Sequence, residues 1–547
     1  MGEPVAVVVS PQPEAAEAGA LVLEKGGNAI DAAVAVAFLQ TVIDPPMAGL
    51  GGYGVMLFRD ASTGKVTALD FSAHAGAAVR PDQWLAGAGA AQPDRFGYAV
   101  DGLLNDIGYQ SVGVPGVVEG LGAAHERWGS LEWGALLGPA IDAARDGVAV
   151  SRAVHDFWLE PPLPGRASGF ERMTATPAAA SIFAPDGELL DVGDTMVQSE
   201  LAVTLEAIAE RGHRDFYEGR IAEAIVADFA AGGGHLTRED LGRYRASFRD
   251  PLRIGYRDWS VYGAPPPAGG QAVAQMLGLL ERFDLAGIGS GGAKSISLLV
   301  EAMKYGIHGR MALGPHPEVR SVEALLRPDH LMPFFSLVSS GGQIEAEPLP
   351  AYEAPTTTQV VVTDREENIV SLTHSLGYGS GVVTPGLGFL FNNYMNVFNP
   401  YPGHSDSLRP GSRRTSSMAP TIVTDRADRP VAALGAPGAT RITSAVLQSL
   451  VNHLDHGMTP VEAVSAPRVD CQGTVVEIEN RVSRSAEATL VESGYEVHRR
   501  ERNYDPYFAR AQMVGLVSGA WKGASDPRRD GGAPVYARAE EAADELG

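Results

Sequence analysis

The sequence has a single cysteine, Cys471, in 547 residues. One thiol excludes a disulfide scaffold and every metal site that is built from several cysteines. A lone cysteine can act as a nucleophile, but Cys471 has no histidine near it in the sequence, and we expect it to be structural. The 13 histidines show no pair at the helical spacing that zinc enzymes use, so we predict no metal site.

Basic side chains and long apolar runs are also scarce. There are 43 lysines and arginines against 66 aspartates and glutamates, which gives a formal charge of −23 with histidine neutral. Such a surface repels polyanions, so we expect neither a nucleic acid nor an anionic membrane as a partner. The sequence contains no run of about twenty apolar residues, which is the length needed to span a bilayer. The N-terminus also lacks the basic and apolar regions of a signal peptide, and we therefore expect a cytoplasmic protein.

The composition is otherwise that of a large folded protein. With 45% hydrophobic residues, the chain can bury a sizeable core as two or more packed units or as one large α/β unit. The segment 162–185 is rich in proline, alanine and glycine and is predicted to be a loop. Near residue 355 the pattern passes from helix-rich to strand-rich. Helices are predicted at 13–25, 29–40, 117–128, 136–146, 200–210, 221–231, 271–283, 294–305, 442–454 and 460–466.

Two glycine-rich motifs invite a functional interpretation. Gly49, Gly51 and Gly54 satisfy the spacing of a dinucleotide fingerprint, but that motif needs a strand before it and a helix after it. Here a helical pattern precedes the glycines and a strand pattern follows, which favours a tight entry into a strand. Ser380 lies in a glycine run that resembles a nucleophile elbow shifted by one position. A glycine-rich loop at the end of a strand explains that run better.

The most informative segment is Pro355-Thr356-Thr357-Thr358, which precedes a valine-rich strand pattern. A threonine hydroxyl is a weak nucleophile at neutral pH and needs a base nearby. One solution makes threonine the first residue of a chain, so that its own α-amine, with a reference pKa of about 8, takes the hydroxyl proton. That solution requires cleavage before the threonine. Taken alone, three threonines before a valine run are more often an ordinary strand edge.

Short motifs occur in a fixed order along nearly the whole chain. They include Gly26-Gly-Asn-Ala-Ile-Asp, Gly49-Leu-Gly-Gly-Tyr-Gly, Ser111-Val-Gly-Val-Pro-Gly, Pro265-Pro-Pro-Ala-Gly-Gly, Thr415-Ser-Ser-Met-Ala-Pro and Gly435-Ala-Pro-Gly-Ala-Thr-Arg. Each motif alone is weak support, but the ordered set resembles the γ-glutamyltranspeptidase family of N-terminal-nucleophile hydrolases. The resemblance implies an α/β fold, the four-layer αββα sandwich of these hydrolases.

The resemblance also implies a proenzyme that cleaves itself between Pro355 and Thr356. The large fragment, residues 1–355, and the small fragment, residues 356–547, would together form one structural domain. Thr356 would be the nucleophile, with its new α-amine as the base. Ser375 falls where relatives have a threonine that hydrogen-bonds the nucleophile.

The same resemblance assigns the substrate pocket. Ser416 and Ser417 match a serine pair that lines it, and Gly438 and Ala439 match the residues whose backbone N–H groups form the oxyanion hole. Alanine at 439 keeps the donor, provided that its backbone angle is one that alanine adopts. Because nucleophile, base and oxyanion donors all come from the chain, we predict no cofactor. The expected partners are a small-molecule amide substrate and the two fragments themselves, a dimer of these heterodimers being left open.

Four positions depart from the family pattern, and all concern recognition of a free γ-glutamyl group. Ser72 stands where relatives carry an arginine for the α-carboxylate, and Gly377 replaces an asparagine. Tyr394 replaces another polar residue, and Val397 replaces the aspartate that pairs with the α-ammonium. Burying an ammonium against Val397 without a partner would cost several kcal/mol. We therefore predict an amidase that cuts a small or apolar acyl amide through an acyl-enzyme, with transfer of the acyl group to an amine also open.

Two arginines are candidates to replace the missing anion binder. Arg528 lies in the Asp-Pro-Arg motif, and Arg441 is equally well interpreted as a structural ion-pair partner. Two other functions stay open at this point: a true γ-glutamyl hydrolase or transpeptidase that acts on glutathione-like amides, and an unprocessed binding protein that keeps the fold. Relatives with altered pockets include oxamate amidohydrolases, cephalosporin acylases and capsule-processing enzymes, and the sequence does not choose among them.

Overall fold

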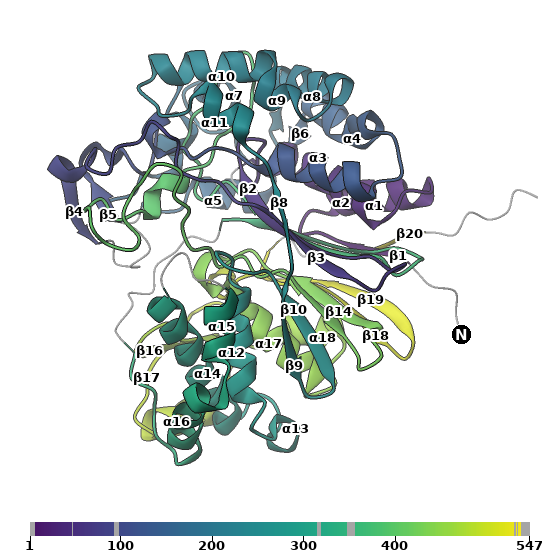
Figure 1. Ribbon diagram of the computed structural model, residues 1–547, viewed down its shortest axis with the longest axis vertical. Helices are drawn as coiled ribbons and strands as arrows, with labels where there is room; N and C mark the ends of the chain where they lie inside the picture. Colours follow the sequence, from purple (N-terminus) through teal and green to yellow (C-terminus); the bar gives the residue numbers. More distant parts are fainter. Residues whose placement is uncertain are drawn as a thin grey trace, which may run out of the picture.

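Two β-sheets lie face to face at the centre of the molecule, with helices on their outer faces (Figure 1). The computed structural model describes residues 6–45, 47–91, 98–162, 164–313, 319–346, 356–529, 532 and 534–537. Each sheet contains strands from both sides of residue 356. The protein is therefore mixed α/β, as the sequence predicts, and residue 356 does not mark a boundary between the sheets.

The first sheet has seven strands in the order β20-β1-β11-β12-β2-β3-β8. All neighbouring strands in it pair antiparallel. In its central pair, Thr358 faces His374 and Thr363 faces Ile369. The strands are β1 Ala6–Val9, β2 Tyr53–Arg59, β3 Val66–Phe71, β8 Ser247–Arg249, β11 Thr358–Thr363, β12 Ile369–Ser375 and β20 Val535–Ala537.

The second sheet has six strands in the order β19-β18-β14-β13-β10-β9, again all antiparallel. Its strands are β9 Leu252–Tyr256, β10 Trp259–Gly263, β13 Thr421–Thr424, β14 Pro430–Gly435, β18 Gln512–Val517 and β19 Ala520–Ser525. Three small sheets are peripheral. They comprise β4 Ala88–Ala91 with β5 Tyr98–Val100, β6 Val148–Ala149 with β7 Thr195–Met196, and β15 Val469–Asp470 with β16 Val475–Ile478 and β17 Glu496–Arg499.

The two sheets meet through one layer of apolar side chains. Successive residues of a strand point to opposite faces, so Val361 of β11 points toward the second sheet and belongs to the same cluster as Ala433 of β14. Val360 and Val362 point the other way and pack in the cluster that the outer helices form. The alternation therefore decides which side chains of β11 lie between the sheets.

Helices cover the outer face of each sheet (Figure 1). The first sheet is covered by α1 Pro13–Glu24, α2 Ala29–Ile43, α3 Val117–Trp128, α4 Trp133–Asp146, α8 Ser199–Arg211, α9 Asp215–Glu218, α10 Arg220–Ala231 and α11 Arg238–Arg243. The second sheet is covered by α12 Gly270–Leu280, α13 Leu285–Ile288, α14 Ala293–Leu313, α16 Pro328–Ser339, α17 Ile442–Leu454, α18 Pro460–Ser465 and α19 Arg484–Glu492. The remaining helices are α5 Arg152–Trp158, α6 Gly169–Met173, α7 Pro177–Phe183 and α15 Val319–Leu325. Among the described residues, no helix combines the length and the apolar character needed to cross a bilayer.

The helix α2 shows how local sequence builds this architecture. Asn28 caps it, because its side-chain oxygen accepts the N–H groups of Ile30 and Asp31 while Asp31 accepts the Asn28 N–H. Nearly every residue of α2 is buried. An apolar helix of this kind is stable only when other elements surround it, and α2 lies between the first sheet, α1 and α4.

Most predicted elements are confirmed, with α3 and α17 at the predicted bounds. The loop predicted for 162–185 is wrong, because this segment contains α6 and α7. Ser168 forms a capping box at the start of α6, and Thr176 caps α7, which has Pro177 at its first position. The proline and the serine therefore mark helix starts here rather than a loop.

Leu57 of β2 is fully buried between the sheets. The substitution Leu57→Ala is expected to lower the free energy of unfolding by about 2–5 kcal/mol, because it leaves a cavity. The control Leu21→Ala removes the same atoms from α1, where the side chain is 53% exposed, and should change it by less than about 0.5 kcal/mol. Urea titrations followed by circular dichroism measure both variants. Equal shifts would contradict the packing between the sheets.

Candidate active site

The threonine run leads into β11 at one end of the first sheet. Thr356 and Thr357 are both buried, and β11 begins at the next residue, Thr358. Pro355, the residue predicted to precede the cut, lies outside the described residues. Because Thr358 pairs with the penultimate residue of β12, Thr357 lies opposite Ser375, the last residue of that strand.

The hydrogen bond that Ser375 accepts from the threonine run comes from Thr357. The Thr357 hydroxyl donates a hydrogen bond to Ser375 Oγ at 3.0 Å, and the Gly377 N–H donates to the same oxygen at 2.9 Å. No hydrogen bond joins Ser375 to Thr356 in the described part of the chain. Thr357 also has a φ of +112°, a backbone angle that a β-branched residue rarely adopts. The geometry singles out the second threonine of the run.

A cavity of about 70 Å³ lies beside these threonines. Most of the residues predicted from the sequence as catalytic or substrate-binding line it. They are Thr356, Ser375, Gly377, Val397, Ser416, Ser417 and Ala439. Thr357, which was not predicted, also lines the cavity. Four other predicted residues, Ser72, Tyr394, Gly438 and Arg528, are not among the lining residues.

The predicted oxyanion residues lie in the turn between β14 and α17. Gly438 has a φ of +144° and Ala439 a φ of +52°. The angle of Gly438 suits glycine alone, and that of Ala439 lies in the left-handed region, where a non-glycine residue costs about 1–2 kcal/mol. Alanine does adopt it here, and Ala439 lines the cavity.

A second loop holds the turn in place from behind. A Cβ atom on Gly438 would lie 2.2 Å from the Cβ of Ala509, so the two backbones approach as closely as glycine permits. The guanidinium of Arg468 donates to the carbonyl oxygens of Phe508 and Ala509 at 3.0 and 2.9 Å. Asp526 accepts the N–H of Ala511 at 2.9 Å. Buried charges therefore fix the loop on which the oxyanion turn rests.

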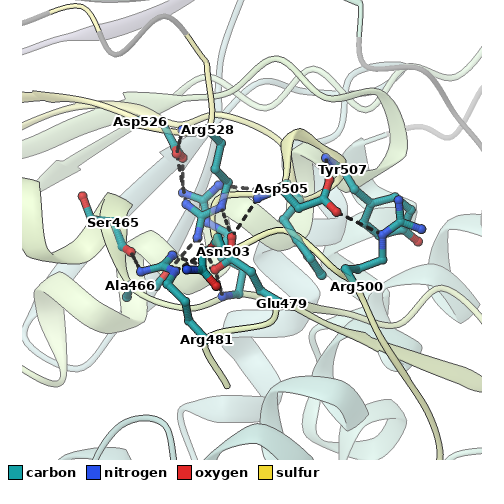
Figure 2. A network of polar contacts seen from close by, with 12 residues as sticks. Ser465, Ala466, Glu479, Arg481, Arg500, Asn503, Asp505, Tyr507, Asp526 and Arg528 are labelled. Carbon is teal, nitrogen blue, oxygen red and sulfur yellow. Dashed lines mark hydrogen bonds and ion pairs between the residues drawn. The ribbon is translucent and has the colours of Figure 1, made fainter. Parts of the chain in front are cut away.

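Arg528 belongs to this buried network, in which Figure 2 shows it beside Glu479 and Asp526. It is not among the residues that line the cavity. Its Nε donates to Glu479 at 2.8 Å, and its Nη1 donates to Asp526 at 3.0 Å. The side chains of all three residues have no exposed area. This placement argues against the predicted contact of Arg528 with substrate. Arg441 is placed similarly, near Asp470 and against the ring of Tyr507.

The substitution Arg528→Met should lower the free energy of unfolding by about 3–5 kcal/mol, because it leaves two buried carboxylates without this partner. The control Arg484→Met changes an arginine whose side chain is 74% exposed and should have little effect. Thermal unfolding measures stability, and the ratio of KM values for two amide substrates measures recognition. A stable Arg528→Met protein with a changed KM ratio would contradict the structural role.

The local geometry at Gly377 suits glycine. Its φ is +68°, and a Cβ atom on it would lie 2.5 Å from Asn393 Oδ1. That oxygen accepts the N–H of Tyr378 at 2.8 Å. A side chain at position 377 would therefore displace Asn393, and this corner of the cavity can present only backbone.

The other three positions bring no charged side chain to the cavity. The N–H of Ser72 donates to Asp70 and its carbonyl oxygen accepts the hydroxyl of Tyr244, so the residue is used in local structure. Tyr394 lies behind the wall, where its hydroxyl accepts the N–H of Arg414 at 3.0 Å. Val397 itself lines the cavity. None of the described lining residues is an aspartate or glutamate.

Sequence reasoning missed several residues of the cavity wall. Arg414 and Arg166 both line it, together with Tyr53 and Asn396. The signal for Arg414 was available, because it comes two residues before the predicted Ser416. Arg166 offered no such signal, since it lies in the segment that was predicted to be a loop.

Other groups that the sequence offered for chemistry are structural. Burial raises the pKa of the Cys471 thiol to about 12, so it is not a thiolate. Burial lowers the pKa of His374 to about 3, and the ring, hydrogen-bonded to Gln40, is neutral. Ser380 is buried and donates to the carbonyl oxygen of Phe391. No cluster of three metal-ligating side chains occurs among the residues that the structure describes.

The glycine run before β2 serves close packing. A Cβ atom on Gly51 would lie 2.6 Å from the carbonyl oxygen of Leu390 and 2.7 Å from the Cα of Phe391. A strand follows the run, as predicted, so no helix N-terminus is offered to a nucleotide phosphate.

Two packed sheets and a cavity beside the residues that precede β11 match the arrangement that the family resemblance implies for an N-terminal-nucleophile hydrolase. The chain belongs to the gamma-glutamyltranspeptidase family, whose model matches residues 15–536. It is 34% identical over 515 residues to the Acylase ACY 1 proenzyme of Pseudomonas sp. strain V22, with 91% of this chain and 88% of the relative covered. It is also 34% identical over 544 residues to the glutathione hydrolase proenzyme of Escherichia coli K12, with 95% and 90% covered.

A solved structure agrees with this assignment. The cephalosporin acylase from Bacillus halodurans superimposes with a TM-score of 0.85 at 28% identity, covering 98% of this chain and 96% of that one. The protein is therefore an enzyme, a hydrolase of this family, and its acylase and glutathione hydrolase relatives are equally similar in sequence. The choice between these two activities depends on the cavity.

Proposed function

We propose that the protein is a self-processing amide hydrolase with an N-terminal threonine nucleophile, and that this nucleophile is Thr357. The hydrogen bond from the Thr357 hydroxyl to Ser375 Oγ, at 3.0 Å beside the cavity, carries the proposal. The resemblance described above assigns to Ser375 the contact with the nucleophile, and Thr357 makes that contact. The cut would then fall between Thr356 and Thr357, one residue later than the sequence analysis predicts.

Processing would use the same hydroxyl. In the uncut chain, Thr357 Oγ attacks the carbonyl carbon of Thr356, the peptide C–N bond breaks, and the hydroxyl proton passes to the nitrogen. Water then hydrolyses the resulting ester and leaves a free α-amine on Thr357. A residue held at an unfavourable φ carries about 1–3 kcal/mol of strain, and cleavage would release the strain at Thr357. The fold of N-terminal-nucleophile hydrolases would then be built by residues 1–356 and 357–547.

The free amine completes the catalytic machinery. It takes the proton of the Thr357 hydroxyl while Oγ attacks the amide carbonyl carbon of the substrate. Of the two residues that the resemblance assigns to the oxyanion hole, Ala439 lines the cavity, and its N–H stabilises the oxyanion. The amine gives its proton to the leaving nitrogen as the C–N bond breaks, and an acyl ester remains on Thr357. Water, deprotonated by the same amine, then attacks the ester and releases the acid.

An acylase-type substrate fits the cavity better than a γ-glutamyl group. An α-ammonium needs a carboxylate partner when it is buried, and leaving it unpaired costs several kcal/mol. Val397 and the absence of any acidic residue among the described lining residues leave no such partner. The transpeptidase reading and the reading as an unprocessed binding protein are the alternatives that the following two experiments address.

The purified protein is expected to run as two bands on a denaturing gel, with Thr357 as the first residue of the small fragment. Thr356→Ala should still be cut, Thr357→Ser should be cut because a hydroxyl is retained, and Thr357→Ala should stay intact. N-terminal sequencing and intact mass measure the outcome. A small fragment that begins at Thr356 would support the earlier position and refute Thr357, and one persistent band would favour a binding protein.

Processed protein is expected to hydrolyse a γ-glutamyl p-nitroanilide at least about 100-fold less efficiently, in kcat/KM, than its preferred acyl anilide, since an unpaired ammonium costs several kcal/mol. Release of nitroaniline measures both rates. Adding an amine acceptor in the same assay separates hydrolysis from transfer. Equal efficiency with the γ-glutamyl substrate would overturn the acylase assignment.

A further inference from the structure

A buried glutamine of α2 contacts both strands that carry the paired hydroxyls. Gln40 is fully buried near the end of α2. Its Nε2 donates to Thr358 Oγ1 at 2.9 Å, and its Oε1 lies 2.8 Å from His374 Nε2. Thr358 and His374 face each other across β11 and β12. One side-chain amide therefore bridges the cross-strand pair that adjoins Thr357 and Ser375.

A second layer of contacts fixes the orientation of this amide. Gln40 Nε2 also lies 3.0 Å from Ser10 Oγ and 2.9 Å from Gln12 Oε1, which both accept from it. The amide nitrogen of Gln12 donates in turn to Asp44. Because a carboxamide oxygen only accepts, Gln12 keeps the nitrogen of Gln40 on this side and leaves its oxygen for His374. The ring of His374, which is neutral, then donates from Nε2.

Gln40 contacts the sheet from the face that is opposite to the cavity. Successive residues of a strand point to opposite faces. Thr358 and His374 point to α2, while Thr357 and Ser375 line the cavity. Gln40 is not among the lining residues. Any effect of Gln40 on a substrate in the cavity must therefore pass through the two strands.

A cut before Thr357 would turn the bond between Gln40 and Thr358 into a bond between two fragments. In the uncut chain, peptide bonds hold Thr357 on both sides. After the cut, only the peptide bond to Thr358 remains. The first residues of a chain are poorly ordered unless other groups hold them, and a reacting group that is displaced by about 1 Å can lose about 100-fold in rate. The new N-terminus therefore needs a contact that holds it in place.

We propose that Gln40 is a positioning residue for the nucleophile, and that by holding Thr358 and His374 together it keeps the Thr357 hydroxyl at hydrogen-bond distance from Ser375 after cleavage. This inference rests on the proposed amide hydrolase function. Because Gln40 acts on the reacting hydroxyl and not on the acyl group, its loss should lower kcat alike for different acyl groups and leave KM nearly unchanged. A glutamine with a purely structural role would affect stability alone.

The test measures kcat and KM for two acyl p-nitroanilides on processed protein. Gln40→Met keeps the length of the side chain without its polar atoms and should lower kcat about 10- to 100-fold, as a small displacement of a reacting group does. Thr358→Val removes only the hydroxyl and should also lower kcat, whereas Thr358→Ser should retain most of it. The double variant should lose no more than the larger single loss, because the two residues act as a unit. A normal kcat in Gln40→Met, or fully additive losses, would overturn the proposal.

Gln198→Met is the matched control. Gln198 is also buried, and its Nε2 donates at 2.8 Å to the carbonyl oxygen of Val42, at the end of the same helix. This variant should lose comparable stability in thermal unfolding and keep its kcat. Hydrogen exchange of the peptide that begins at Thr357 requires no turnover. Faster exchange in Gln40→Met than in Gln198→Met would uphold the positioning role even if hydrolysis failed, and equal exchange would refute it.

Sequencing of the wild-type small fragment separates this inference from the proposed function. A fragment that begins at Thr356 would refute Thr357 as the nucleophile and, with it, the role of Gln40 in holding that nucleophile. A fragment that begins at Thr357, together with an unchanged kcat in Gln40→Met, would refute the role of Gln40 alone.

Discussion

The face-to-face packing of the two sheets is the constraint on which the site depends. It determines which side chains at the end of β11 enter the cavity, because a shift of one residue turns every side chain to the other face. Three threonines stand in a row, yet only Thr357 meets Ser375. The hydroxyl of Thr358 points to the helix side, where it accepts from Gln40 at 2.9 Å. Strand geometry thus gives adjacent threonines different hydrogen-bond partners.

The opposite wall depends on charges that never reach solvent. Asp526 is buried, which raises its pKa, but Arg468 and Arg528 lower that pKa below its usual value. The ionised group then holds the N–H of Ala511. Buried ion networks contribute little net stability but leave a large penalty if one member is lost. Here the network fixes the loop that packs against Gly438, so its contribution is to position the oxyanion turn.

The sequence predicted the fold class, the main helices and strands, and most residues around the cavity. Periodicity and capping signals are local, which explains why α3 and α17 appear at the predicted bounds. Ser416 and Ala439 line the cavity. Their place could be predicted because each lies in one of the ordered motifs. Arg528 could not be placed in this way, since its partners Glu479 and Asp526 are decided by tertiary contacts.

The choice among neighbouring threonines was beyond the sequence for a related reason. Thr356 and Thr357 are chemically identical, and a motif match does not state which hydroxyl reaches the neighbouring strand. Strand register supplies that information, through the pairing of β11 with β12. Arg414 was overlooked although it lies two residues before Ser416, because charge in a sequence does not reveal which side chains will line a cavity.

The order of strands in the first sheet has a consequence for the lifetime of the enzyme. β1, from the N-terminal part, lies between β20 and β11 from the C-terminal part. In the uncut chain these strands are tethered to one another, so refolding requires no encounter between separate chains. After cleavage refolding becomes an encounter of two chains, and its success depends on their concentration. The mature protein would thus persist mainly because it unfolds slowly, and less because it refolds after unfolding.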